Sequence, residues 1–279
     1  MPEGDSLHRA AQLLYPKLVG ERLGSLLLVR SSTRTEGLIG SEISNVEARG
    51  KNLLVHFAVG FSLHVHLKMN GRVRSYPRAT APKIALSAAS VVLETAAHRV
   101  VIYAAPVARL LRTRDLVGDL YFRDLGPDLL GPSFELAEGI RRLKLRKHTP
   151  LGEAIMDQGV IAGIGNVWKS ELCFSLRLDP FASVSAFGDE DLAALLSLAR
   201  TQMFDNVYGP KRTMPDPFEG HGERKARLDR RQGEHVLSVY EREGKACYDC
   251  GAPIEMRRQG EQQRSTYFCP SCQPARSQA

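Results

Sequence analysis

Short apolar runs dominate the chain between about residues 20 and 125. The segments 52–57, 61–67, 91–94 and 100–103 are rich in β-branched and other apolar residues and are too short for helices. Because these strands follow one another without intervening helices, they predict a β-sandwich or a partly closed barrel. The turn-like residues 125–128 and 131–132 mark the end of this region.

Helical periodicity replaces the strand pattern from residue 151 to about 207, most clearly in 191–200. The basic stretch 141–147 leads to Thr149-Pro150, which we interpret as an interdomain hinge. The segment 209–233 is rich in Pro, Gly and charged residues and has no periodicity, so we interpret it as a mobile loop.

The pattern thus predicts an α+β multidomain chain. We expect an N-terminal β-sandwich domain over 1–130, a linker over 131–150, a helical domain over 151–240 and a small module over 241–275.

An amphipathic helix is predicted near the N-terminus. Asp5 is a good N-cap, and Pro16 predicts a bend or a break. The apolar residues expected on one face are Leu7, Ala10, Ala11, Leu14 and Leu18.

Four cysteines near the C-terminus form two pairs, Cys247-x2-Cys250 and Cys269-x2-Cys272, with 18 residues between the pairs. Two such knuckles can close a tetrahedral, structural Zn²⁺ site without an open coordination position. The strand-like stretches around Gln259-Gly260 then predict a zinc-pinned hairpin. Two disulfides or unrelated thiols are the alternative, which no secretory context favours. Cys173 lies in an apolar stretch and is interpreted as a small buried hydrophobe.

Composition and charge narrow the class of protein. The hydrophobic content of 43% supports ordinary cores rather than disorder. We find no signal peptide and no transmembrane span, and we expect a cytoplasmic protein. The net charge of +7 favours an anionic partner. Together with Arg257, Arg258 and Arg264 in the predicted hairpin, this charge points to DNA or RNA.

The first residues carry candidate chemistry. A small residue after Met1 normally allows the initiator methionine to be removed, which would leave Pro2 with a secondary amine as the N-terminus. An α-amino group titrates near neutrality, and its attack on an aldehydic carbon gives an iminium, a strong electron sink. Glu3 can serve as a general acid or base. The positive end of the following helix disfavours the ammonium form and attracts phosphate, and it should lower the pKa of Glu3. The same residues also fit an ordinary capped helix start.

Five segments, in the same order along the chain, resemble the formamidopyrimidine-DNA glycosylase and endonuclease VIII family, which excises oxidised bases and nicks the strand. They are Pro2-Glu3-Gly4-Asp5, Arg49-Gly50-Lys51-Asn52-Leu53, Asp157-Gln158 with 161–171, 239–244 followed by Cys247, and 263–273. The start resembles the endonuclease VIII branch. The resemblance implies a helix–two-turn–helix element for the helical domain and a zinc finger for the module at 241–275.

The resemblance also implies catalytic roles. Pro2 would attack C1′ of the damaged nucleotide, and Glu3 would assist ring opening and proton transfer. Lys51 would contact phosphate and sugar during the lyase steps, which are β-elimination and then δ-elimination. Arg264, at the hairpin tip, would grip the phosphate that flanks the lesion. A solvated charge is the alternative interpretation for Lys51, and nonspecific positive charge is the alternative for Arg264.

Contacts to DNA follow from the same resemblance. Asn166 would lie in a tight turn, where Gly163 and Gly165 let the backbone approach a phosphate and the amide can donate to it. An Asn that caps a helix is the alternative. Lys68 and Met69 lie in a loop that resembles the family's wedge, where Met69 would replace lost base stacking. A core methionine is the alternative.

Two histidines and two departures from the family pattern complete the picture. His64 and His66 share one strand face and are interpreted as packing or phosphate contacts rather than metal ligands. The oxidised-purine branch carries an arginine and a phenylalanine where this chain has 103–107. Endonuclease VIII has a DNA-contacting arginine where this chain has Asp124, next to Arg123. With the Gly4-Asp5 start, the pattern favours the endonuclease VIII side and therefore oxidised pyrimidines, ring-opened purines or single-stranded lesions.

The sequence therefore predicts a bifunctional DNA glycosylase and AP lyase with one structural Zn²⁺. We expect it to act as a monomer on damaged DNA, duplex or single-stranded, with no membrane association. A noncatalytic zinc-finger protein that binds damaged or single-stranded nucleic acid is the main alternative, and it would have no use for a free N-terminal proline. A zinc-ribbon component of the ribosomal or transcription machinery explains the charge but not the Pro2-Glu3 start.

Overall fold

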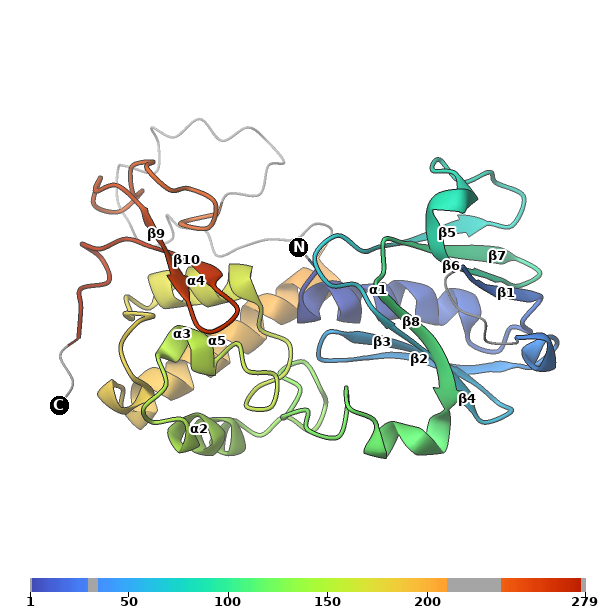
Figure 1. The fold of residues 1–279 in the computed structure, drawn as a ribbon, viewed down its shortest axis with the longest axis horizontal. Coiled ribbons are helices and arrows are strands. Elements are labelled where there is room, and N and C mark those ends of the chain that lie inside the picture. Colours follow the sequence, from blue (N-terminus) through green and yellow to red (C-terminus); the bar gives the residue numbers. More distant parts are fainter. Residues whose placement is uncertain (1, 30–34, 210–236, 277–279) are drawn as a thin grey trace. The chain divides into compact units, whose positions relative to one another are not determined.

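The computed structural model describes residues 2–29, 35–209 and 237–276, and the chain forms two compact units, Met1–Leu125 and Gly126–Ala279 (Figure 1). The segment predicted as a mobile loop, 209–233, lies outside the described residues apart from Gly209. Within the described residues, no helix combines the length and the apolar character that a membrane crossing requires.

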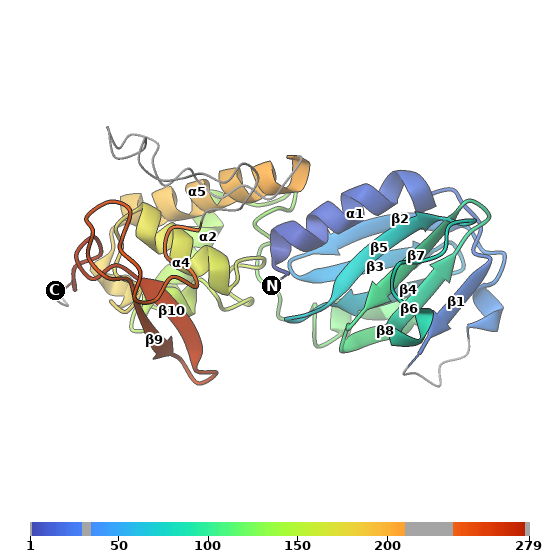
Figure 2. The same ribbon diagram turned by 90° about the horizontal axis from the view of Figure 1, so that it is seen from above.

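The first unit is a β-sandwich of two antiparallel four-stranded sheets with one long helix (Figure 2). The strand order is β1-β6-β7-β5 in one sheet and β2-β3-β4-β8 in the other. The strands are β1 (Ser25–Leu28), β2 (Ile43–Arg49), β3 (Asn52–Phe57), β4 (Phe61–His66), β5 (Arg72–Pro77), β6 (Ala89–Glu94), β7 (His98–Tyr103) and β8 (Val107–Arg112). The predicted β-sandwich and its four predicted strands are confirmed, and the four further strands are more polar or shorter.

The core of the first unit lies between the two sheets and under helix α1 (Gly4–Leu18). Strand β3 alternates between this core and the outer face of its sheet, and both sides are buried. Leu53, Val55 and Phe57 belong to the core, whereas Asn52 and His56 are buried polar residues on the outer face. The outer face of this sheet is therefore covered rather than open to solvent.

Helix α1 begins at Gly4, before the predicted N-cap Asp5. Glu3, not Asp5, is the N-cap: its backbone is extended, and its N–H donates to Ser6 Oγ at 3.4 Å. Asp5 lies in the first turn, where its Oδ1 accepts the Ser6 N–H at 2.7 Å. The predicted break at Pro16 is wrong, because the helix continues to Leu18. A proline so close to the helix end removes a single hydrogen bond from the last turn.

The apolar face of α1 is largely as predicted. Ala10 is only half-buried, and the remaining members of the predicted face are buried. These buried residues are Leu7, Ala11, Leu14 and Leu18.

The second unit is helical, with α2 (Leu136–Leu145), α3 (Leu151–Ala154), α4 (Asn166–Ser175) and α5 (Asp189–Tyr208). It begins at Gly126 and includes the segment that the sequence predicts as a linker, so the linker prediction is wrong for 131–150. Leu143 of α2 is fully buried in the core of this unit. A Cβ on Gly139 would lie 2.8 Å from Leu196 Cδ1, which shows how closely α2 and α5 pack. Because α2 carries many basic residues, its apolar face is not apparent from the sequence, and the segment was predicted as a linker.

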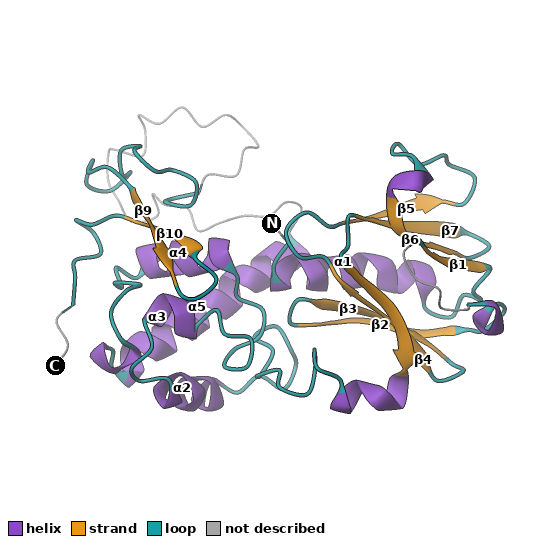
Figure 3. Ribbon diagram, in the orientation of Figure 1, coloured by secondary structure: helices purple, strands orange, loops and turns teal. Residues whose placement is uncertain are grey.

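A β-hairpin follows, formed by β9 (Glu255–Gln259) and β10 (Arg264–Phe268), with its turn at 260–263. The predicted hairpin is therefore confirmed. Strand β10 packs on helix α4. In Figure 3 this hairpin supplies the strands drawn in the second unit, whereas the remaining strands lie in the first.

Candidate active site and metal centre

Pro2 and Glu3 immediately precede the first turn of α1. Pro2 is half-buried, and Glu3 has only 1% of its surface exposed. The Glu3 carbonyl accepts the N–H groups of Ser6 and Leu7 at 3.0 and 3.2 Å, so the chain enters the helix directly from this residue. A carboxylate is well placed at this position because the helix N-terminus carries partial positive charge.

The start of α1, the β2–β3 turn and the β4–β5 loop lie at the same end of the first unit (Figures 1 and 2). The sheet register gives the reason. Asn52 pairs with His66, and His66 pairs with Val107, so the chain segments beyond these residues emerge at a common sheet edge. The structure thus gathers Pro2, Glu3, Lys51 and the predicted wedge loop at one end of the sandwich.

Lys51 occupies the two-residue turn between β2 and β3 rather than a strand. Gly50 precedes it with φ of +55°, a conformation that glycine adopts readily. Two lysines, Lys51 and Lys68, act on His66. Burial, then the charges of Lys68 and Lys51, lowers the pKa of His66 to about 4. The histidine is therefore neutral at physiological pH, and the two ammonium groups supply the positive charge of this region.

The predicted wedge loop, residues 67–71, has a fixed backbone. The Lys68 N–H donates to His66 Nδ1 at 3.1 Å, and the Gly71 N–H donates to the Leu67 carbonyl at 3.0 Å. A Cβ on Gly71 would lie 2.6 Å from that carbonyl oxygen, so only glycine fits there. Met69 is 50% exposed at the loop tip. The alternative of a core methionine is therefore wrong.

Buried polar side chains cover the outer face of the β2-β3-β4-β8 sheet, which sequence reasoning did not predict. His56 Nδ1 lies 2.8 Å from Ser62 Oγ, and His56 Nε2 lies 3.1 Å from Glu47 Oε1. The hydrogen bond with His56 is the largest effect that lowers the pKa of Glu47. This Ser–His–Glu array resembles a hydrolase triad, but Ser62 is fully buried and no substrate can reach it.

His64 is also fully buried, and its ring makes edge contacts with Tyr121 and Phe122 at centroid distances of 5.0 and 4.9 Å. Burial, then the charge of Arg109, lowers the pKa of His64 to about 3. Of the two predicted roles for this residue, the structure supports packing.

In the second unit, Gln158 makes three hydrogen bonds within the turn before α4. Gln158 Oε1 accepts the Gly163 N–H at 3.1 Å, and Gln158 Nε2 donates to the carbonyls of Met156 and Ile164 at 2.8 and 3.1 Å. Gly163 has φ of +116°, which residues with a side chain rarely adopt. The turn thus delivers the chain to α4, which begins at Asn166.

Asn166, for which the sequence predicts a phosphate contact, is directed at strand β10 in the structure. It is 4% exposed, and its Nδ2 donates to the Ser265 carbonyl at 2.7 Å and to Ser265 Oγ at 3.2 Å. The side chain therefore joins the start of α4 to strand β10.

Lys169, one turn further along α4, was missed by sequence reasoning. It is 1% exposed, and its ammonium donates to Thr266 Oγ1 at 2.6 Å and to the Ser265 carbonyl at 3.2 Å. Thr266 Oγ1 donates in turn to Gln259 Oε1 at 2.9 Å. Lys169 is followed by the polar residues Ser170 and Glu171, so no local pattern in the sequence marks it as buried.

Arg264 is the first residue of β10, next to the hairpin turn, and its side chain is half-buried. Its Nε and Nη2 donate to Gln262 Oε1 at 3.1 and 2.7 Å. The guanidinium is thus oriented by a neighbour in the turn. Asn166, Lys169 and Arg264 all belong to the second unit.

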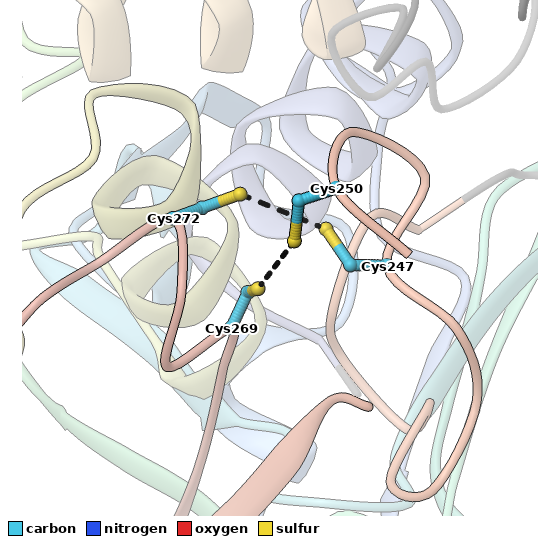
Figure 4. A group of neighbouring side chains, drawn as sticks. All are labelled: Cys247, Cys250, Cys269 and Cys272. Atoms are coloured by element: carbon cyan, nitrogen blue, oxygen red, sulfur yellow. Dashed lines mark hydrogen bonds between the residues drawn. The ribbon is translucent and has the colours of Figure 1, made fainter. Parts of the chain in front are cut away.

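The four paired cysteines converge as predicted, and their Sγ atoms all lie within 4.8 Å of one another (Figure 4). The Cys247–Cys272 and Cys250–Cys269 sulfur distances are 3.9 and 3.4 Å. Disulfide sulfurs would be about 2.05 Å apart, whereas a Zn–S length of about 2.3 Å sets tetrahedral sulfurs about 3.8 Å apart. The donor set and spacing therefore fit a zinc ion and exclude the disulfide alternative in this structure.

A buried carboxylate anchors the chain before the first cysteine pair. Glu171 of α4 accepts the backbone N–H groups of Ser238, Val239 and Tyr240 at 2.8, 2.9 and 2.8 Å. Burial raises the pKa of Glu171, and the three N–H donors oppose this rise.

Cys173, two residues further along α4, is fully buried in the helical core, and burial raises its pKa to about 12. It is a packing residue, as predicted, and lies outside the cysteine cluster.

Two family models match the chain. The formamidopyrimidine-DNA glycosylase N-terminal domain matches residues 1–107, and the formamidopyrimidine-DNA glycosylase H2TH domain matches residues 125–213. H2TH denotes the helix–two-turn–helix element.

Named relatives cover nearly the whole chain. The DNA-(apurinic or apyrimidinic site) lyase Nei2 of Mycolicibacterium smegmatis is 35% identical over 99% of this chain and 100% of its own. The Endonuclease 8 2 of Mycobacterium tuberculosis is 32% identical over 98% of this chain and 100% of its own. The crystal structure of the MutM (Fpg) protein of Thermus thermophilus is 26% identical, covers 98% of each chain and has a TM-score of 0.75.

Proposed function

Because the chain belongs to the formamidopyrimidine-DNA glycosylase and endonuclease VIII family, we propose that it is a bifunctional DNA glycosylase and AP lyase acting on damaged DNA. The observation that carries the proposal is the placement of Pro2 and Glu3 at the start of α1. This start lies at the same end of the sandwich as the Lys51 turn and the wedge loop. A noncatalytic DNA-binding protein would not need the N-terminal proline and Lys51 at the same end of the sandwich.

Pro2 is the nucleophile in this proposal. After removal of Met1, its neutral amine attacks C1′ of the damaged nucleotide, the bond from C1′ to the base breaks, and the base leaves with a proton. The sugar ring opens as its oxygen takes a proton, for which Glu3 is the nearest candidate along the chain, and the C1′–N bond becomes an iminium.

The iminium makes the C2′ proton acidic. Loss of that proton expels the 3′ phosphate by β-elimination, and a second, δ-elimination expels the 5′ phosphate and releases the sugar remnant. Lys51 supports these steps by neutralising phosphate charge close to the reacting carbon. The charges of Lys51 and Lys68 both lower the pKa of His66, so the two ammonium groups lie near the same end of the sheet. This concentration of positive charge supports the role of Lys51.

DNA contacts are proposed for both units. Met69, exposed at the tip of a fixed loop, fills the space of the extruded nucleotide, and Lys68 holds the backbone beside it. In the second unit, the N-terminus of α4 offers N–H groups to a phosphate, and Asn166 contributes by fixing α4 to β10. Arg264 grips the phosphate that flanks the lesion with its planar guanidinium and assists the δ-elimination.

One structural Zn²⁺ is proposed at Cys247, Cys250, Cys269 and Cys272. Four thiolates leave no open coordination position, so the ion holds the hairpin and takes no part in the reaction. From the Gly4-Asp5 start, which resembles the endonuclease VIII branch, we propose oxidised pyrimidines as substrates. We further propose that the enzyme acts as a monomer in the cytoplasm, in association with DNA.

Borohydride trapping tests the covalent step. Protein whose Met1 has been removed should form a reduced adduct with DNA that carries an abasic site, because borohydride reduces the iminium. We expect less adduct from the Pro2→Gly variant, whose primary α-amine replaces the secondary amine, and none from protein that retains Met1. The adduct is measured by denaturing gel and by mass spectrometry of the N-terminal peptide. Gln12→Ala, an exposed change on α1, is the control and should trap normally.

Two outcomes would contradict the proposal. A full yield of adduct from protein that retains Met1, with the DNA attached outside the N-terminal peptide, would assign the nucleophile to another residue. Tight binding to oxidised and abasic DNA without any adduct would favour the noncatalytic alternative.

A further inference from the structure

A continuous series of buried and partly buried hydrogen bonds connects the segment after β8 to the turn that carries Lys51. Arg109 of β8 pairs with Asp119 through Nη2 and donates from Nε to His64 Nδ1 at 3.0 Å. His64 Nε2 lies 2.9 Å from Asn52 Oδ1. Asn52 Nδ2 donates to the Arg49 carbonyl at 3.0 Å. Arg49 and Asn52 are the two residues that enclose the Gly50-Lys51 turn.

The direction of every proton in this series is fixed. Arginine has only donors, so His64 Nδ1 must accept, and the proton of the neutral ring lies on Nε2. That N–H donates to Asn52 Oδ1, which leaves the Asn52 NH₂ group for the Arg49 carbonyl. A ring protonated on both nitrogens could not accept from Arg109, and burial together with Arg109 keeps His64 neutral.

We propose that His64, acting through Asn52, is a positioning residue for Lys51 in the lyase reaction, and that Arg109 and Asp119 fix its orientation. The proposal rests on the proposed function, because that function places the Lys51 ammonium at the reacting sugar. It goes further by assigning a role to buried residues that touch no substrate.

The arrangement suits a turn that must hold a flexible side chain in place. Gly50 gives the turn its φ of +55° and little stiffness of its own. Asn52 is 3% exposed and His64 is fully buried, so the hydrogen bond between them is shielded from water. The bond to the Arg49 carbonyl therefore ties the first side of the turn to the sheet, which limits the positions that the Lys51 ammonium can take.

A second buried histidine provides a matched control. His56 lies on the same sheet face and strand as Asn52, and its partners are Ser62 and Glu47. Glu47 Oε1 also accepts from the side chain of Arg49, so His56 reaches the turn through an exposed side-chain pair and makes no bond to its backbone. His56→Leu should cost stability much as His64→Leu does, without loosening the turn.

A double-mutant cycle with Lys51→Ala tests the role in catalysis. We expect His64→Leu and Asn52→Leu each to slow single-turnover cleavage of abasic-site DNA about tenfold at saturating protein, because small displacements of a catalytic group are costly. In the Lys51→Ala background the same changes should have no further effect. An equal slowing in that background, or an equal slowing by His56→Leu, would overturn the proposal.

Amide hydrogen exchange of the free protein gives a readout that does not depend on activity. His64→Leu should speed exchange at residues 50–52 about tenfold or more, whereas His56→Leu should leave these amides unchanged. Unchanged exchange in His64→Leu would overturn the positioning role even if the enzyme cleaves DNA. Loosening of the turn in a protein that forms no borohydride adduct would instead contradict the proposed function and leave the positioning of the turn intact.

Discussion

Several ionisable side chains in this protein are buried, and each has specific partners. Glu171 receives three backbone N–H groups, Lys169 donates to a carbonyl and a hydroxyl, and His64 lies between Arg109 and Asn52. Burial without partners would cost several kcal/mol, of the order of 2–7 for a neutral polar group and more for a charge. These buried residues therefore determine the positions of the segments they bond to, and they also contribute to stability.

Glu171→Gln tests this at the residue scale. One amide oxygen can still accept from Val239 and Tyr240, but the NH₂ group would face the Ser238 N–H, donor against donor. We expect a loss of about 1–3 kcal/mol in the free energy of unfolding, measured by urea denaturation at neutral pH. Glu243→Gln, an exposed change in the same unit, is the control and should have little effect. Equal stability of the two variants would show that Glu171 is not an anchor.

Single residues show what sequence reasoning can reach. The spacing within the two cysteine pairs was enough to predict a metal site, and the apolar neighbours of Cys173 were enough to predict its burial. Asp5 was predicted as the N-cap because its side chain suits that position, but Glu3 precedes it and has the extended backbone. Asn166 was expected to face a phosphate, and its amide instead bonds to Ser265, 99 residues further along the chain.

At the scale of elements, the turn before α4 is bridged by the side chain of Gln158. Gln158 supplies an acceptor to Gly163 and donors to two carbonyls, which closes a turn that contains a glycine with positive φ. The shape of this turn decides where the N–H groups at the start of α4 point.

Gln158→Ala should therefore weaken both folding and DNA binding. We expect a loss of about 1–3 kcal/mol in stability, since buried groups of the turn lose their partners. Binding to abasic-site DNA, measured by fluorescence anisotropy at fixed salt, should fall as well. Gln12→Ala on the exposed side of α1 should change neither. Lower stability with unchanged binding would remove the turn from the DNA interface.

The predicted linker illustrates how an element can be misjudged. Residues 141–147 contain five basic residues, a pattern that is typical of a solvated segment. Those charges belong to the exposed side of α2 and its C-terminal end, while Leu143 is buried. Arg142 pairs with Glu138 one turn earlier, an interaction that supports a helix rather than an extended linker.

At the scale of the whole molecule, the chain is stabilised by separate hydrophobic cores. One core fills the sandwich, a second fills the helical part, and a third small cluster surrounds the cysteines. The third includes Val239, Ile254 and Phe174 and is small, so we expect the proposed zinc ion to stabilise the hairpin.

Metal removal tests this division. The protein should contain one zinc per chain by atomic absorption, and chelation should abolish DNA binding and the exchange protection of β9 and β10. Amides of the sandwich should stay protected, because their core contains no cysteine. Cys173→Ala, which changes a cysteine outside the cluster, should keep one zinc. DNA binding that survives complete metal loss would contradict the role assigned to the hairpin.

The sequence by itself determined the β-sandwich, the helical unit, the cysteine cluster and the family, because each depends on local periodicity or on fixed spacing within short segments. Only the tertiary structure decided which residues are brought together from distant segments: Asn166 and Lys169 with β10, Glu171 with the chain before Cys247, and His64 with the Lys51 turn. The physical reason is that a buried polar group is stable only beside its partner. That partner is chosen by packing and strand register, which a local pattern does not contain.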